Sequence, residues 1–121
     1  MRYLCMVHMG PDTFSGLSDE DRRQLDRDSL GYDRELQAGG HFIAAEALHS
    51  PDSAVLVKVR DGEISATDGP FSETKEYLGG FILIEARDMN EAIRLAAGIP
   101  MARLGAIEVR PVYAIPDPER T

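Results

Sequence analysis

The stretch "RYLCMVHM", residues 2–9, decides how this chain folds, because apolar side chains occupy both of its alternating faces. A strand of that composition lies in the middle of a sheet, where both of its faces are shielded from water. The stretch "GFILIEA", residues 80–86, has the same character. We therefore expect two central strands in one sheet.

The segment between these strands first predicts a helix. Ser18 is a good N-cap residue, and the acidic residues that follow it suit the positive end of a helix dipole. Gly39-Gly40 ends the helix, because glycine adopts the left-handed conformation freely, and Gly31 weakens it by about 1 kcal/mol relative to alanine. Four side chains at helical spacing form a stripe expected to face the sheet: Leu25, Ser29, Tyr32 and Leu36.

The segment "AVLVKVRDGEISAT", residues 54–67, predicts a β-hairpin that turns at Asp61-Gly62. This dipeptide suits a two-residue type I′ turn, in which both residues have positive φ. The turn places three pairs opposite each other across the strands: Arg60 with Glu63, Val59 with Ile64, and Lys58 with Ser65.

Three further elements complete the chain: a strand over residues 41–48, a helix from a cap at Asn90 to Ala97, and a strand over residues 106–113. The second helix is expected to turn Met89, Ala92, Ile93 and Ala96 inward. The order β-α-β-hairpin-β-α-β indicates an α+β protein, a ferredoxin-like split β-α-β sandwich with an inserted hairpin. We expect one domain over residues 1–114 and a tail over residues 115–121.

Two helices cover only one face of such a sheet, so the apolar residues of the other face need a cover. A second copy of the same sheet is the economical cover. We therefore expect a homodimer or higher homo-oligomer whose sheets pack face to face.

The composition narrows the classes of partner. Among 121 residues, 13 Lys and Arg stand against 21 Asp and Glu, for a net charge of −8. This balance opposes binding to nucleic acid or anionic lipid, and no apolar run approaches the length of a membrane span. The single cysteine, Cys5, excludes an intrachain disulfide. We expect a cytoplasmic protein with no nucleic-acid or membrane partner.

The stretch "TDGPFSETKEYLGGF", residues 67–81, carries unusually dense polar chemistry for a connection between strands. Pro70 restricts Gly69, and Asp68 can bond nearby backbone N–H groups, so a rigid turn accounts for the first part. It does not account for the charged residues that follow, Glu73, Lys75 and Glu76. In a partly enclosed cleft they could transfer protons; on an open surface they would form only weak ion pairs.

Charged residues on the last strand offer a second cluster. Glu108 and Arg110 share one face of a strand whose other face is apolar, so under a dimer partner they would need counter-charges. Lys75 with Glu108, and Arg110 with Glu73 or Asp68, are candidate pairs. His8 should point to the same face as Glu108, either as a proton carrier or as a structural histidine. An ion-pair network without a ligand is the other interpretation.

The stretches "DGPFSETKEYLGGF" and "GAIEVRPV" resemble the DGPF-motif branch of the YCII-related family, over about residues 3–112. The resemblance implies a dimeric α+β barrel, and one distant relative resembles a dehydrochlorinase of a chlorinated hydroxyquinol. Activity in that superfamily is attached to a histidine on the first helix and an aspartate before the proline after the second helix. Neither is present here, since Gly98-Ile99 precede Pro100.

We therefore expect a protein that binds a small anionic or phenolic molecule in a cleft between sheet and helices, lined by Asp68, Glu73, Lys75, Glu76 and Arg110. As an enzyme it would catalyse elimination or isomerisation without a cofactor: Glu73 or Glu76 would move the proton and Lys75 or Arg110 would stabilise negative charge. The expected ligand-binding residues are Asp68, Glu108, Arg110 and His8. No metal site is expected, because His-x-His and HExxH spacings are absent. The alternative is a non-catalytic regulatory or interaction module, since relatives of this kind are associated with alternative sigma factors.

Overall fold

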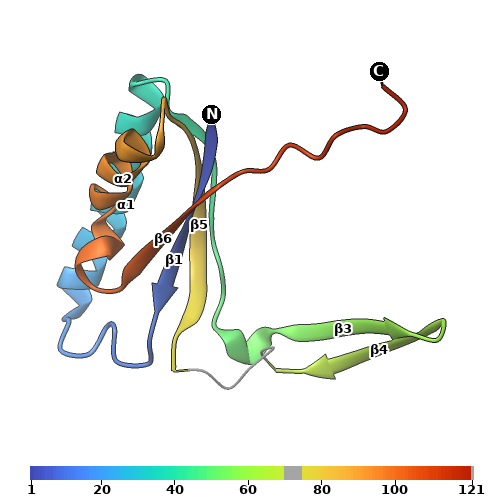
Figure 1. Cartoon of the computed structure of the whole chain (residues 1–121). Coiled ribbons are helices and arrows are strands. Elements are labelled where there is room, and N and C mark those ends of the chain that lie inside the picture. Colours follow the sequence, from blue (N-terminus) through green and yellow to red (C-terminus); the bar gives the residue numbers. More distant parts are fainter. Residues whose placement is uncertain (70–74, 121) are drawn as a thin grey trace.

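The computed structural model describes residues 1–69 and 75–120. It shows the expected α+β fold, in which two helices cover one face of an antiparallel sheet (Figure 1). The elements are β1 (Arg2–Met9), α1 (Asp19–Ala38), β2 (Phe42–Ala47), β3 (Val55–Arg60), β4 (Glu63–Asp68), β5 (Tyr77–Glu85), α2 (Met89–Ala97) and β6 (Ala106–Pro111), with short 3-10 helices η1 (Pro51–Ser53) and η2 (Pro100–Arg103).

The main sheet has the strand order β2-β5-β1-β6, the order of a ferredoxin-like sheet. β1 lies between β5 and β6 and is antiparallel to both, and β5 lies between β2 and β1. Both predictions of a central strand are therefore confirmed. β5 starts at Tyr77, three residues before the predicted strand.

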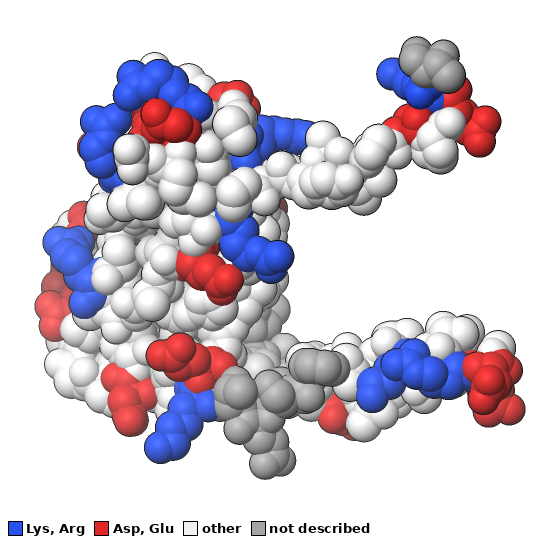
Figure 2. All heavy atoms as spheres, viewed as in Figure 1, with Lys and Arg blue, Asp and Glu red and all other residues white. Residues whose placement is uncertain are grey.

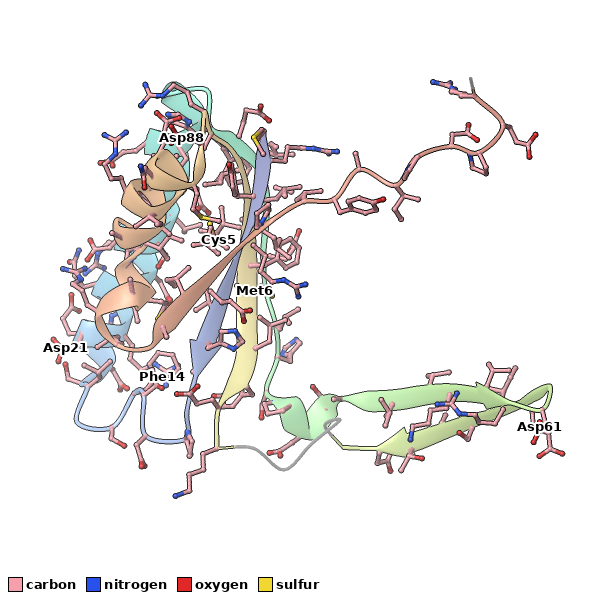
Figure 3. The ribbon with its side chains drawn as sticks, in the orientation of Figure 1. Cys5, Met6, Phe14, Asp21, Asp61 and Asp88 are labelled. Carbon is pink, nitrogen blue, oxygen red and sulfur yellow. The ribbon has the colours of Figure 1, made fainter. Side chains whose placement is uncertain are left out.

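The core lies between the sheet and the helices. Alternation along β1 turns Tyr3, Cys5 and Val7 toward the helices, and β5 contributes Ile82 and Ile84; all five are at most 9% exposed. Figure 3 shows Cys5 on the helix side of β1 and Met6 on the other side. Burial raises the pKa of the Cys5 thiol to about 11. The predicted inward stripe of α1 is confirmed, with Leu36 buried and Leu25, Ser29 and Tyr32 half-buried.

The helix ends follow the predicted chemistry at α1 and depart from it at α2. The Ser18 side chain accepts a hydrogen bond from the Asp21 N–H at 3.0 Å, and the Asp21 carboxylate accepts one from the Ser18 N–H at 3.2 Å, forming a capping box. The predicted Asn90 cap is wrong: Asp88 caps α2 and accepts from the N–H of Glu91. Of the predicted inward residues, Ala92 and Ala96 are buried and Met89 is half-buried, but Ile93 is 52% exposed and Leu95 packs against the core instead.

The hairpin forms as predicted. Asp61 and Gly62 have φ values of 52° and 78°, and the three predicted cross-strand pairs are all present. β3 and β4 form a two-stranded sheet of their own. This hairpin arm, residues 55–68, extends from one end of the main sheet on the side without helices, and the C-terminal tail extends on the same side from the other end (Figure 1, Figure 2).

Candidate functional site

A cleft of about 880 Å³ opens between α1 and the part of the sheet made by β2 and β5. α1 forms one wall, the end of β2 and the start of β5 form the other, and η2 and the end of β1 complete it. A cavity of this volume falls in the range that accommodates small organic ligands. The cleft lies on the helix-covered side of the sheet.

The floor of the cleft is apolar. The strands turn Val7, Ala45 and Ile82 toward the helices, and Ile99 and Met101 are contributed by η2 and the residue before it. The strands β2 and β5 approach closely at Gly80, where a Cβ atom would lie 2.8 Å from the Glu46 carbonyl oxygen and 3.2 Å from the Ala47 Cα. Gly80 therefore permits the close packing of β2 on β5 that shapes this side of the cleft.

The wall of the cleft carries the polar groups. α1 contributes Asp26, Ser29, Tyr32 and Asp33, whereas Glu46 of β2 is the cross-strand partner of Phe81 and therefore turns its side chain to the helix-free face. Among the described residues that line the cleft, Arg22 is the one Lys or Arg side chain against these carboxylates. The cleft is therefore suited to a ligand that donates hydrogen bonds rather than to one that carries negative charge.

Tyr32 is held in place by its hydroxyl group. The hydroxyl donates a hydrogen bond of 2.6 Å to the backbone carbonyl of Leu95, which ties α1 to α2. Burial, followed by the charge of Glu35 and by Cys5, raises the pKa of Tyr32 above its usual value. Because its proton is committed to Leu95, the phenolic oxygen is left to accept a hydrogen bond from a ligand.

Asp33 is a candidate proton-transfer group. Burial raises its pKa above the ordinary value of 3.8, because desolvation disfavours the charged carboxylate. Carboxyl groups with raised pKa values beside a cavity are typical of functional sites. Asp33 therefore brings a carboxyl that takes up and releases a proton closer to neutral pH than an ordinary aspartate does.

The entrance of the cleft is formed by the loop before α1 and by the end of β2. The guanidinium carbon of Arg22 lies 4.5 Å from the centre of the Phe14 ring, so a cation–π contact holds this loop against α1. Figure 3 shows Phe14 beside the start of α1. His49, which is exposed, lines the opposite side of the cleft.

The structure places His8 and Glu108 together, as predicted, but on the helix-free face. His8 Nε2 lies 2.8 Å from Glu108 Oε1, joining neighbouring strands β1 and β6. The His8 side chain is 28% exposed and that of Glu108 is 50% exposed. The predicted pairing of Glu108 with Lys75 is wrong, because His8 is the ion-pair partner of Glu108.

The other predicted site residues that the structure describes are dispersed, and none of them lines the cleft. Arg110 lies on the helix-free face, two residues from Glu108, because Val109 between them turns toward the helices. Asp68 is exposed at the base of the hairpin arm. Lys75 and Glu76 are exposed and directly precede Tyr77, which lines the cleft. Glu73, with its predicted pairing to Arg110, lies outside the described residues.

The charged α1 residues of the cleft that the sequence interpretation missed are Asp26 and Asp33. A signal for both was present, since each follows a residue of the predicted inward stripe of α1, Leu25 and Tyr32. The sequence motif directed attention instead to the charged residues beside Asp68.

In the part of the chain that the structure describes, no three His, Cys, Asp or Glu side chains gather in a way that could hold a metal ion. Within the same residues, neither helix combines the length and the apolar composition needed to cross a membrane.

The fold and the cleft together define an α+β protein of the ferredoxin-like class with a ligand-sized cavity between its first helix and its sheet. Residues 1–116 match the YCII-related domain, so the chain belongs to the YCII-related family. An uncharacterized protein of Rhizobium meliloti (strain 1021) is 31% identical over 114 residues, covering 93% of this chain and 92% of the relative.

A solved structure shows a similar fold. It is the 5-chloro-2-hydroxyhydroquinone dehydrochlorinase TftG from Burkholderia phenoliruptrix AC1100, in complex with 2,5-dihydroxybenzoquinone. Its TM-score is 0.56 and its sequence identity 16%, over 93% of this chain and 94% of TftG.

Proposed function

We propose that this protein binds a small phenolic or quinone-like molecule in the cleft between α1 and the sheet, and that carboxylates of the cleft convert it by proton transfer without a cofactor. The observation that carries the proposal is the cleft itself, about 880 Å³ with an apolar floor and a wall of hydrogen-bonding groups. An apolar cavity with a few convergent polar groups is the usual form of a small-molecule site.

The chemistry of the wall favours a neutral phenol over the anionic ligand that the sequence also suggested. Asp26 and Asp33 would repel a carboxylate but would accept hydrogen bonds from hydroxyl groups. The ring of a phenol matches the floor at Val7 and Ile82.

Each polar group has a distinct role in the proposed reaction. Asp33 takes a proton from the ligand or returns one, because its raised pKa brings it closer to neutral pH. The oxygen of Tyr32 accepts a hydrogen bond from a ligand hydroxyl and orients the ring. Arg22, at the entrance, stabilises the negative charge that develops on a phenolate or enolate oxygen. This arrangement suits an elimination or an isomerisation.

The relatives support the proposed location of the site but not the proposed roles of individual residues. The resemblance to YCII-related proteins attaches activity to the first helix and to the residue before the proline after the second helix. Here Ile99 and Pro100 line the cleft, as do several residues of α1. TftG, which has a similar fold, holds 2,5-dihydroxybenzoquinone. Because this chain has Ile99 in place of the aspartate, its proton transfer would depend on Asp33.

Glu73, Lys75 and Glu76 remain proposed contributors at the cleft entrance. Lys75 and Glu76 directly precede Tyr77, which lines the cleft. They therefore lie next to the cleft but do not line it. The ligand-binding roles of Asp68, Glu108, Arg110 and His8 would require a site on the helix-free face instead.

The proposal is tested by calorimetric titration of hydroquinone and of chlorohydroquinone, both neutral phenols, into the wild type and matched variants. Ser29→Trp fills the cleft from α1 and should weaken binding by about tenfold or more. The control Ser65→Trp places the same bulk on the hairpin arm and should bind like the wild type. Equal binding by all three proteins, or no binding by the wild type, would overturn the cleft as the site.

Turnover is tested separately by following substituted hydroquinones spectroscopically with the wild type and Asp33→Asn. Loss of turnover with retained binding in Asp33→Asn supports the proton-transfer role. Binding without turnover of any phenol by the wild type is the result expected for the alternative, a non-catalytic regulatory module.

We propose further that a second copy covers the helix-free face. Leu4, Met6, Phe81 and Leu83 on that face are only half-buried within the chain. Sheet faces that pack together bury such residues, and the resemblance to YCII-related proteins implies a dimeric assembly.

A further inference from the structure

We propose that the hairpin arm, residues 55–68, clamps the second copy of the chain by packing its apolar face on the partner. The inference rests on the proposed dimer and is independent of the proposed ligand. It assigns a role to a part of the fold that neither the core nor the cleft uses.

The two faces of the arm differ sharply in chemistry. One face carries Val55, Val57, Val59, Ile64 and Ala66, with Asp68 opposite Val55 at its base, since cross-strand partners point to the same side. The other face carries the polar side chains Lys58, Arg60, Glu63, Ser65 and Thr67, with Leu56 at its base. Alternation of this kind is typical of strands with one face buried and one face in water.

The apolar face is nonetheless uncovered within the chain. The exposed fractions are 56% for Val55, 62% for Val57, 57% for Val59 and 77% for Ile64. In the described part of the chain, β3 and β4 hydrogen-bond only with each other as strands. An isolated two-stranded hairpin is marginally stable in water, so a contact outside the chain is needed to stabilise it.

The direction of the arm indicates what makes that contact. The arm projects past the helix-free face of the sheet, and a hollow open to solvent separates it from the C-terminal tail (Figure 2). A two-fold dimer repeats each contact on both subunits. If the helix-free faces pack together, each arm necessarily extends alongside the other subunit, and its exposed valines meet protein instead of water.

The charge and composition of the arm argue against a membrane as the occupant. Lys58 and Arg60 are balanced by Asp61 and Glu63, so the arm has no basic surface for anionic lipid. Its apolar face is aliphatic and lacks the aromatic residues that anchor at a membrane interface. Short aliphatic side chains on a two-stranded ribbon suit packing against another protein surface.

The first test is sedimentation velocity across a dilution series. Val57→Glu places a charge in the centre of the apolar face and should weaken dimerisation by about tenfold or more. Ser65→Glu, on the opposite face of the arm, should dimerise like the wild type. Circular dichroism checks that both variants retain the fold.

Photo-crosslinking from the arm tests the same contact and remains informative even if Val57→Glu does not fold. Val57→Cys is labelled with benzophenone maleimide and irradiated; the native Cys5 stays unlabelled because it is 0% exposed and burial raises its pKa to about 11. A covalent dimer, formed much more efficiently than from labelled Ser65→Cys, is the expected result.

The outcomes separate the arm from the dimer. A dimer that is unchanged by Val57→Glu and gives no covalent product would overturn the clamp and leave the sheet-to-sheet dimer standing. A wild type that is monomeric throughout would overturn both. Either result leaves the titration of the cleft unaffected, because the cleft lies on the helix-covered side.

Discussion

The two faces of the central sheet are built from the same strands but reach different degrees of burial. On the helix-covered face, Tyr3, Cys5 and Ile84 are at most 2% exposed. One residue along each strand, Leu4 and Leu83 are only half-buried on the helix-free face. The covered face is completed by the helices of the same chain, whereas the free face is apolar at its centre and charged toward β6.

This difference separates the two kinds of function that the fold supports. The covered face includes a gap where α1 stands away from β2 and β5, and this gap forms the cleft. The free face has the hairpin arm and the tail on either side of it (Figure 2). We therefore propose ligand chemistry for the covered face and assembly for the free face.

The largest expected effect compares truncations on the two faces. Ile84→Ala should lower the free energy of unfolding by about 2–5 kcal/mol, because it leaves a cavity in a buried core. Leu83→Ala should cost less in dilute protein, and its cost should increase with protein concentration if a second copy covers it. Urea unfolding at several protein concentrations measures both. Equal, concentration-independent losses would contradict the assignment of the free face to assembly.

A second prediction concerns the close approach that shapes the cleft. Gly80→Ala should destabilise the protein by about 1–3 kcal/mol, because the added Cβ would press on the backbone of β2. Gly31→Ala is the matched control: a Cβ added there meets no heavy atom within 4 Å beyond its own helix backbone and chain neighbours, so this variant should be more stable by about 1 kcal/mol. Thermal unfolding of both variants distinguishes local crowding from a general intolerance of alanine.

The third prediction is the pH dependence that Asp33 imparts. Its pKa is raised in the folded protein above 3.8, so the folded state holds the proton more tightly than the unfolded state. The free energy of unfolding therefore declines as the pH rises from 3.8 through the raised pKa. Asp33→Asn removes this decline. The difference between variant and wild type should change across this window and become constant above it; a difference with no pH dependence would contradict the raised pKa.

The smallest effect is expected for the ion pair on the free face. Because His8 and Glu108 are both partly exposed, Glu108→Gln should change the free energy of unfolding by only about 0–1 kcal/mol in the monomer. Chemical denaturation at low concentration measures this. A much larger loss would indicate that the free face is more enclosed within one chain than its exposure shows.

Much of the fold could be predicted from local sequence signals. The Asp61-Gly62 turn fixed the hairpin register because type I′ geometry demands these residues. Strands 2–9 and 80–86 were placed centrally because apolar side chains on both faces require two covers. The Asn90 cap was wrong because Asp88, two residues earlier, offers the same chemistry, and local propensity does not distinguish adjacent candidates.

The site was harder to predict, because the cleft arises from how α1 packs on the sheet. The motif around Asp68 concentrates charge, yet charge density in sequence does not reveal which side chains meet across the fold. The alternation along β6 did predict correctly that Glu108 and His8 share a face. It could not show that this face is opposite the one that holds the cleft.

The most direct test of the central assignment is a two-dimensional NMR titration of the wild type with hydroquinone, a neutral phenol. Binding in the cleft should shift the backbone signals of Ser29, Tyr32, Gly79 and Gly80, which line it. Shifts confined to His8, Glu108 and Arg110 would place the ligand on the helix-free face and contradict the account.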